Sequence, residues 1–167
     1  PTGILLGFEI SMNPFSGRPS WEAIVKLPLA EKLVHLRDPA FRQRVMSETC
    51  PEENLRKRVS TYERIFPWDG DVPDYEPPAE QSIAVRASRE GRDPEELVYD
   101  VLLEREGTRI LYRPLSNYAY GNLDTVGEML RHPNTLVSLG DGGAHVGVLC
   151  DSTSMAYMVG GWPFSNR

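Results

Sequence analysis

One stretch near the C-terminal end, "VSLGDGGAHVG" (137–147), concentrates residue types that can do chemistry. The carboxylate of Asp141 is followed directly by Gly142 and Gly143, and His145 lies two residues further on. A carboxylate can ligate a metal ion or transfer a proton, and glycine lets the backbone turn sharply and a ligand approach closely. Asp141 is therefore a candidate catalytic residue and metal ligand, and the residues after it are candidate substrate contacts.

The same residues also fit a structural role for Asp141. Asp-Gly is a common turn pair, in which the carboxylate accepts hydrogen bonds from the backbone of its own turn. The imidazole of His145 could reach the mouth of a site built around Asp141, because histidine can bind or transfer protons near neutral pH. The spacing alone leaves the catalytic and the turn interpretation of Asp141 open.

The other histidines and the cysteines carry weaker signals. His35 lies inside an expected helix and should be a surface residue, and His132 precedes a proline at the end of another helix. Neither has the spacing of a metal-ligand pair. Cys50 and Cys150 are too few and too far apart for a disulfide framework, and we expect both thiols to be inert.

The strands expected from the sequence are short. "GILLGF" (3–8) is a continuous apolar run, which indicates a strand buried on both faces, as in a parallel sheet. "RILYRP" (109–114) alternates, and "TLVSL" (135–139) is an apolar run that ends just before Asp141. In α/β barrels the catalytic groups lie where strands end, so a strand over 135–139 would place Asp141 at such an end.

Between the first two strands the pattern predicts a succession of short helices, and one more helix is expected over 122–133. A loop over 67–78 interrupts this succession and holds four prolines and four acidic residues. The expected helix signals are a cap at Ser20, an opening proline at Pro28, a cap at Asp38, a terminating glycine at Gly91, a cap at Asp93 followed by Pro94, and a terminating glycine at Gly107.

This order of elements predicts an α/β fold, mostly helical with a few short strands. We expect a single partial domain over 1–167, with a strand and loop over 1–15, a helical excursion over 16–108, and the last strands with an active-site loop over 109–167. The chain enters a strand-like run at once and ends without a helix stop signal, so we expect it to be part of a larger protein.

The composition of the chain restricts the binding partners and the location that we expect for it. The net charge of −6 gives no indication of binding to a nucleic-acid backbone. No apolar run approaches the roughly 18 residues of a membrane span, and no signal-peptide pattern is present. With two distant cysteines as well, the expected location is the cytoplasm.

Several segments together resemble a known family. "HPNTLVSLGDGGAHVGVLCDSTSMAYMV" is similar to the closing segment of the N-acyl-D-amino-acid deacylases, a branch of the amidohydrolase superfamily. The segments "GRDPEELVYDVLLEREG" and "YGNLDTVGEMLRHP" resemble those that precede it in that branch. "GILLGFEISMNPF" and "LPLAEKLVHLRDPAFRQRVMSE" resemble it too, so the resemblance covers most of the chain in order.

The resemblance implies that the chain is the C-terminal part of a metal-dependent (β/α)8 barrel, a TIM barrel. It implies a zinc-dependent hydrolase acting on the amide of N-acyl-D-amino acids or a related small molecule. Asp141 matches the family's aspartate at the tip of the last strand, which touches the metal site. In the family this carboxylate takes a proton from the metal-bound water and delivers it to the leaving amine.

The sequence also departs from the family. The His-x-His pair of the first barrel strand and the histidines of the middle strands have no counterpart here, so we expect the isolated chain to bind no zinc and to be inactive. A partial barrel leaves apolar strands uncovered, so we expect the fragment to self-associate. The alternative from a different class is a non-catalytic helical interaction module that ends in an Asp-Gly turn.

Overall fold

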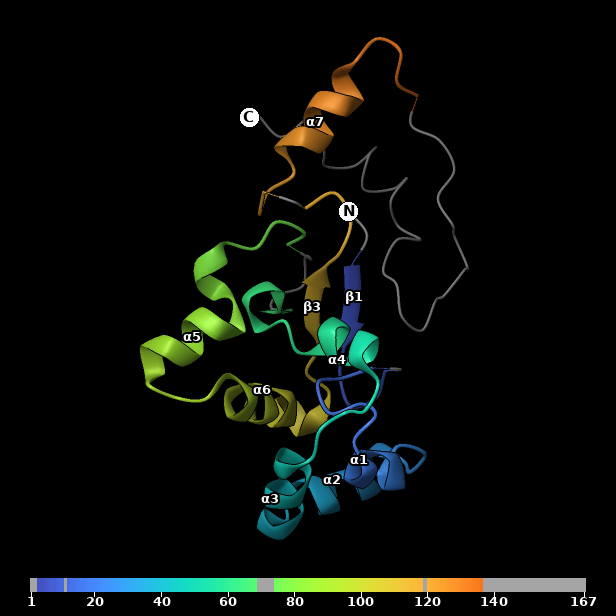
Figure 1. The fold of residues 1–167 in the computed structure, drawn as a ribbon, viewed down its shortest axis with the longest axis vertical. Coiled ribbons are helices and arrows are strands. Elements are labelled where there is room, and N and C mark those ends of the chain that lie inside the picture. The colour runs from blue at the N-terminus through green and yellow to red at the C-terminus, as the bar shows by residue number, and fades with distance from the viewer. Residues whose placement is uncertain (1–2, 11, 69–73, 119, 137–167) are drawn as a thin grey trace.

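The computed structural model describes residues 3–10, 12–68, 74–118 and 120–136. The described part is an α/β structure in which about half of the residues are helical and a small sheet has three strands. Figure 1 shows the sheet in the middle of the molecule, with helices α1 to α3 at one end and helix α7 at the other.

The sheet is antiparallel and has the order β1-β3-β2. Strand β1 (Gly3–Leu6) pairs with β3 (Leu111–Pro114) in a register that places Gly3 opposite Pro114 and Leu6 opposite Leu111. The two-residue strand β2 (Phe66–Pro67) pairs with the other edge of β3. The helical excursion therefore begins after β1 and ends before β3, and these two strands are neighbours in the sheet.

The parallel pairing expected for the first strand is wrong, although its burial is as expected. Ile4 and Leu6 on one face of the sheet join the main core, while Leu5 packs against a second cluster on the other face. Burial on both faces produces a continuous apolar run whatever the direction of the neighbouring strand. The sequence pattern reported the burial and carried no information on strand direction.

Short helices make up most of the remainder. In chain order they are α1 (Pro19–Ile24), α2 (Leu29–Leu36), α3 (Pro39–Ser47), α4 (Glu53–Val59), the 3₁₀ turn η1 (Tyr62–Arg64), the 3₁₀ turn η2 (Ala79–Gln81), α5 (Ile83–Glu90), α6 (Pro94–Leu103), the 3₁₀ turn η3 (Glu104–Gly107) and α7 (Asp124–Arg131). None of the helices in the described ranges combines the length and the apolar character that crossing a bilayer would require.

The helix signals expected at Asp38, Gly91 and Asp93 are confirmed. The Asp38 carboxylate accepts a hydrogen bond from the Ala40 N–H at 3.0 Å, and Asp93 accepts from the Glu95 N–H at 2.8 Å. Gly91 ends α5 in the left-handed conformation, at φ 63°. Such caps satisfy backbone groups at helix ends that otherwise have no partner inside the helix.

Three expected helix boundaries are wrong. Pro28 was expected as the first helical residue, but it is the cap of α2, which begins at Leu29. The cap of α1 is Arg18, because Pro19 has the fixed φ of a first helical residue, and Ser20 lies inside the helix. Helix α6 ends at Leu103 rather than continuing to Gly107. The chain turns through η3 first, and a Cβ on Gly107 would lie only 2.8 Å from the Leu33 side chain.

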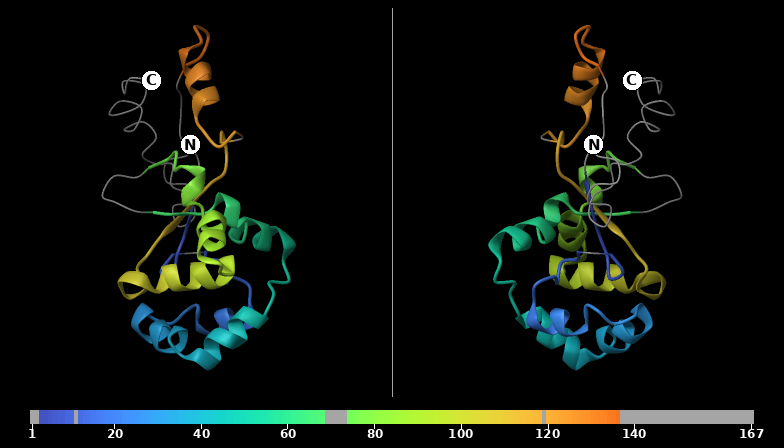
Figure 2. Two further views of the ribbon diagram at one scale, coloured as in Figure 1. Left: turned by 90° about the vertical axis from the view of Figure 1, so that its left-hand side faces the viewer. Right: turned by 90° about the vertical axis from the view of Figure 1, so that its right-hand side faces the viewer.

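The hydrophobic residues form two clusters on opposite faces of the sheet. The main core is shared by strands β1 and β3 and the helices of the excursion, with Phe8, Phe15, Trp21 and Tyr99 as its large aromatic residues. The second cluster consists of Tyr75, Tyr112, Tyr118 and Leu123, with Leu5, Trp68 and Val126 packed against it. Figure 2 shows α1, α2, α3 and α6 at one end of the sheet, with α4 and α5 level with its strands.

The strand expected over 135–139 falls mostly outside the described residues. Thr135 and Leu136 are described and have no regular structure. Helix α7, which precedes them, agrees with the helix expected over 122–133.

Candidate functional site

The four residues selected from the sequence as the site cannot be placed. Asp141, Gly142, Gly143 and His145 all lie outside the described residues. The catalytic, substrate-binding and metal-binding roles assigned to them therefore stay predictions.

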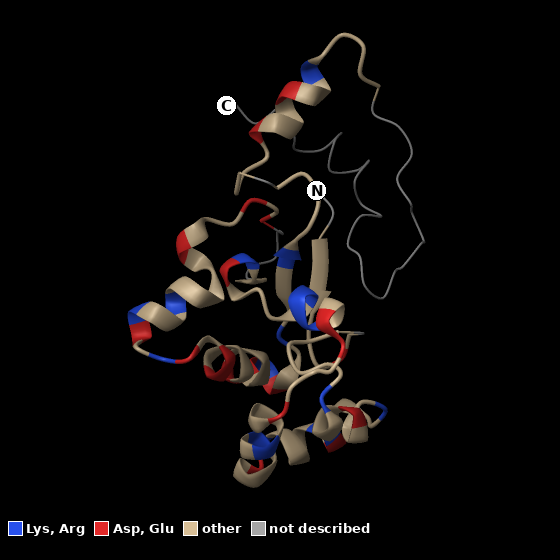
Figure 3. Ribbon diagram, in the orientation of Figure 1, with Lys and Arg blue, Asp and Glu red and all other residues tan. Residues whose placement is uncertain are grey.

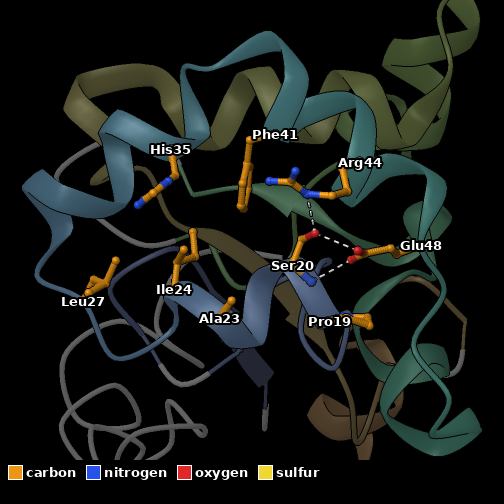
Figure 4. Close-up of a pocket in the computed structure, with 9 residues that line it drawn as sticks. All are labelled: Pro19, Ser20, Ala23, Ile24, Leu27, His35, Phe41, Arg44 and Glu48. Carbon is orange, nitrogen blue, oxygen red and sulfur yellow. Dashed lines mark hydrogen bonds between the residues drawn. The ribbon is translucent and has the colours of Figure 1, made fainter.

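The described residues form a cleft of about 450 Å³ between helices α1, α2 and α3. Its apolar lining comes from α1 and from the segment that follows it, together with Phe41 on α3, as Figure 4 shows. The apolar residues are Ala23, Ile24, Leu27 and Phe41. This part of the cleft suits an apolar group of a ligand or of another chain.

One end of the cleft is polar. The Ser20 hydroxyl donates to the Glu48 carboxylate at 2.6 Å, and the Ser20 N–H donates to the same carboxylate at 2.8 Å. Arg44 Nε donates to the Ser20 hydroxyl at 3.1 Å. The Ser20 N–H is one of the free donors in the first turn of α1, so Glu48 acts as a cap supplied by a residue 28 positions away.

The Arg44 guanidinium lies over the Phe41 ring, with its carbon 5.5 Å from the ring centroid. This contact holds the cation next to the apolar part of the cleft. A carboxylic acid with an apolar tail has matching chemistry.

The arrangement does not form a nucleophile and its base. His35, the histidine of the cleft, lies at the end opposite Ser20, with Phe41 between them (Figure 4). A base that activates a serine must lie within hydrogen-bond reach of its hydroxyl. Ser20 therefore serves as a structural link between α1 and the end of α3.

The implied zinc has no site in the described part of the chain. Within these ranges no three His, Cys, Asp or Glu side chains come together as metal ligands would. Asp141, the ligand that the resemblance implies, lies outside the ranges. The described residues therefore do not fit a zinc ion.

Of the other residues singled out from the sequence, His35, His132 and Cys50 lie as expected, and Cys150 lies outside the described residues. His35 and His132 are both exposed, and His132 Nδ1 accepts a hydrogen bond from the Asn134 N–H at 3.2 Å at the end of α7. Cys50 is a buried free thiol that contacts the Glu52 carbonyl oxygen at 3.5 Å. Its packing among core residues agrees with an inert role.

Sequence reasoning missed the polar link across the cleft. Ser20 and Glu48 are far apart along the chain, and only the packing of α1 against α3 brings them together. Ser20 stood out as a helix cap, and no local pattern marked Glu48 as its partner.

Comparison with models of protein families, with curated proteins and with solved structures finds no match to this chain.

Proposed function

We propose that this chain is part of a zinc-dependent amidohydrolase of the N-acyl-D-amino-acid deacylase branch. The substrate is a small N-acyl amino acid or a related amide, and the reaction is hydrolysis of its amide bond. The chain supplies the closing part of the barrel, with Asp141 at the tip of the last strand. The metal-binding histidines come from residues outside this chain.

The observation that carries the proposal is the resemblance of residues 132–159 to the closing segment of that branch. A second feature is compatible with it. Strands β1 and β3 are antiparallel, whereas the strands of a (β/α)8 barrel are parallel, so in this proposal the pair lies outside the barrel sheet and joins the two ends of a helical insertion. An insertion of this kind can be added to a barrel without disturbing the barrel's strand order.

In the proposed reaction Asp141 acts as a proton shuttle. Its carboxylate accepts a proton from the attacking water and donates it to the nitrogen of the leaving amine. Gly142 and Gly143 keep the backbone beside the carboxylate free of side chains, so that substrate can approach. His145 contacts the substrate at the mouth of the site.

The test is the Asp141→Asn variant of the full-length protein, assayed with N-acetyl-D-amino acids. Asparagine keeps the size of the side chain and removes the base. General acid–base catalysis contributes roughly 10²- to 10⁴-fold, so kcat should fall at least about 100-fold while KM changes far less. Asp38→Asn is the matched control, because asparagine is also a good helix cap and Asp38 lies on the exposed end of α3.

Full activity in Asp141→Asn would return Asp141 to the role of a turn residue. Loss of bound metal together with activity would instead make it a ligand first, with another group moving the proton.

The alternative, a non-catalytic helical module, has the cleft between α1 and α3 in its favour. Ala23 is an exposed residue of that cleft, and Ala23→Trp would fill it. If binding of a partner is the function, Ala23→Trp abolishes it and Asp141→Asn does not. If deacylation is the function, Asp141→Asn impairs amide hydrolysis and Ala23→Trp does not.

A further inference from the structure

Arg113 occupies an unusual place for an arginine. It lies on β3 two residues after Leu111, so both side chains point to the same face of the strand. Leu111 belongs to the main core, and Arg113 pairs across the sheet with Ile4, another core residue. The guanidinium therefore leaves the sheet on its apolar, helix-covered side.

The guanidinium has no acceptor among the residues that the structure describes. Its Nε and Nη1 are both buried, and neither makes a hydrogen bond. Arg113 as a whole is only partly buried. A buried guanidinium without a counter-ion is costly, because its charge has lost water and gained no partner.

Two further arginines, Arg64 and Arg58, lie near enough to Arg113 for their charges to act on it. Arg64, on η1, is held near β3 because its Nη2 donates to the Tyr118 carbonyl oxygen at 2.7 Å and because β2 pairs with β3 two residues later. Arg58 is on α4, next to the core residue Val59. Burial lowers the pKa of Arg113, and the charges of Arg64 and Arg58 lower it further.

No carboxylate balances these charges in the part of the chain that is described, where none of the three arginines forms an ion pair. Figure 3 shows blue segments on β3 and on α4. The charge of the whole chain is −6, so a group of positive charges at one point is a local feature. Guanidinium groups bind carboxylate and phosphate oxygens in pairs, which suits an anion between them.

We propose that Arg113, Arg64 and Arg58 form an anion-binding site that takes the carboxylate or phosphate group of a small molecule. Arg113 supplies the buried donors on the floor of the site, Arg64 is fixed by its backbone contact, and Arg58 approaches from the solvent side. The site does not depend on Asp141 or on the proposed hydrolysis. A bound carboxylate would be compatible with an N-acyl amino acid as ligand.

The test is titration of the full chain with inorganic phosphate and, separately, with N-acetylglycine, followed by calorimetry and thermal melting at constant ionic strength. We expect one saturable equivalent of at least one of the two anions. Binding of N-acetylglycine alone identifies a carboxylate site, and binding of phosphate alone identifies a phosphate site. Arg113→Met should weaken binding about tenfold or more, and Arg131→Met, the same change on exposed α7, should not.

Stability without anion gives an independent readout. Arg113→Met removes an uncompensated buried charge, so in anion-free buffer it should melt at or above the temperature of the unmodified chain. Arg58→Gln should weaken binding about threefold without affecting folding, because Arg58 is exposed, and Arg56→Gln on the same helix is its control. The proposal is overturned if neither anion binds saturably, if Arg113→Met and Arg58→Gln leave binding unchanged, or if Arg113→Met lowers the melting temperature without anion. The last result would mean that Arg113 pairs with a carboxylate of the chain itself.

Discussion

Arg18 shows how a buried charge is accommodated elsewhere in the molecule. Its side chain is 9% exposed and forms an ion pair with Glu95, and its Nη1 also donates to the Val45 carbonyl oxygen at 2.8 Å. The guanidinium carbon lies 5.3 Å from the centroid of the Phe15 ring. Arg18 therefore links the start of α1 to α3 and to the first turn of α6, with its charge compensated.

Glu95→Gln tests this compensation. The amide can still accept a hydrogen bond, but Arg18 would keep a buried charge without a counter-ion. We expect the free energy of unfolding to fall by about 2 kcal/mol, somewhat less than for a fully buried pair, in urea denaturation at pH 7. Glu96→Gln, an exposed neighbour in the same helical turn, should change it by less than about 0.5 kcal/mol. Equal effects of the two changes would assign the loss to the helix dipole.

Asp100 makes stability depend on pH. Burial by itself would raise its pKa, but hydrogen bonds from Arg42 and Arg92 outweigh burial, and the pKa lies below its ordinary value of 3.8. The native state therefore favours the charged carboxylate. The resulting stabilisation is present at pH values above the ordinary pKa and is lost as pH falls through the lowered one.

Asp100→Asn should accordingly lower the melting temperature by about 2–4 °C at pH 7, which corresponds to ~1 kcal/mol for partly exposed pairs. The difference from the unmodified chain should shrink as pH falls below about 4. Thermal melts from pH 7 to pH 2 measure it, with Asp38→Asn as the control. A difference that stays constant over this range would show that the charge of Asp100 is not its cause.

At the scale of the elements, local chemistry explains which features could be predicted. Asp38, Asp93 and Gly91 act on backbone groups two to five residues away, and their roles were readable from the sequence. The direction of β1 depends on residues 111–114, more than a hundred positions later. The cleft also depends on residues that are far apart in the sequence, because Ser20 and Glu48 meet only when α1 packs against α3.

The cap of α6 gives a prediction at this scale. Asp93 accepts from two backbone N–H groups at the start of the helix, and α6 supplies Val98, Tyr99 and Leu102 to the main core. Asp93→Ala should lower the free energy of unfolding by about 1 kcal/mol, whereas Asp93→Asn should change it by much less. Urea denaturation of both variants measures the effect. A similar loss in the asparagine variant would mean that charge, not capping, is the contribution of Asp93.

At the scale of the whole molecule, helix α7 stands apart from the excursion (Figures 1 and 2). Its one fully buried residue is Gly127, while Met129 is 46% exposed and Leu136, shortly after the helix, is 90% exposed. Within the described part of the chain, β1 is also an edge strand of the sheet. Exposed apolar side chains and an open strand edge both favour association with another chain.

We therefore expect the chain to self-associate, with a mean mass that rises with concentration in light scattering across a dilution series. Met129→Lys combined with Leu136→Lys should shift this rise to higher concentration, because both charges enter the apolar surface around α7. Val34→Lys is the matched control: Val34 is 72% exposed on α2, at the opposite end of the molecule. A constant monomer mass at every concentration would contradict the expectation. Because each lysine reduces the chain's negative charge of −6, an effect of net charge alone would shift the rise to lower concentration in both variants. Association through the β1 edge would leave both variants unchanged.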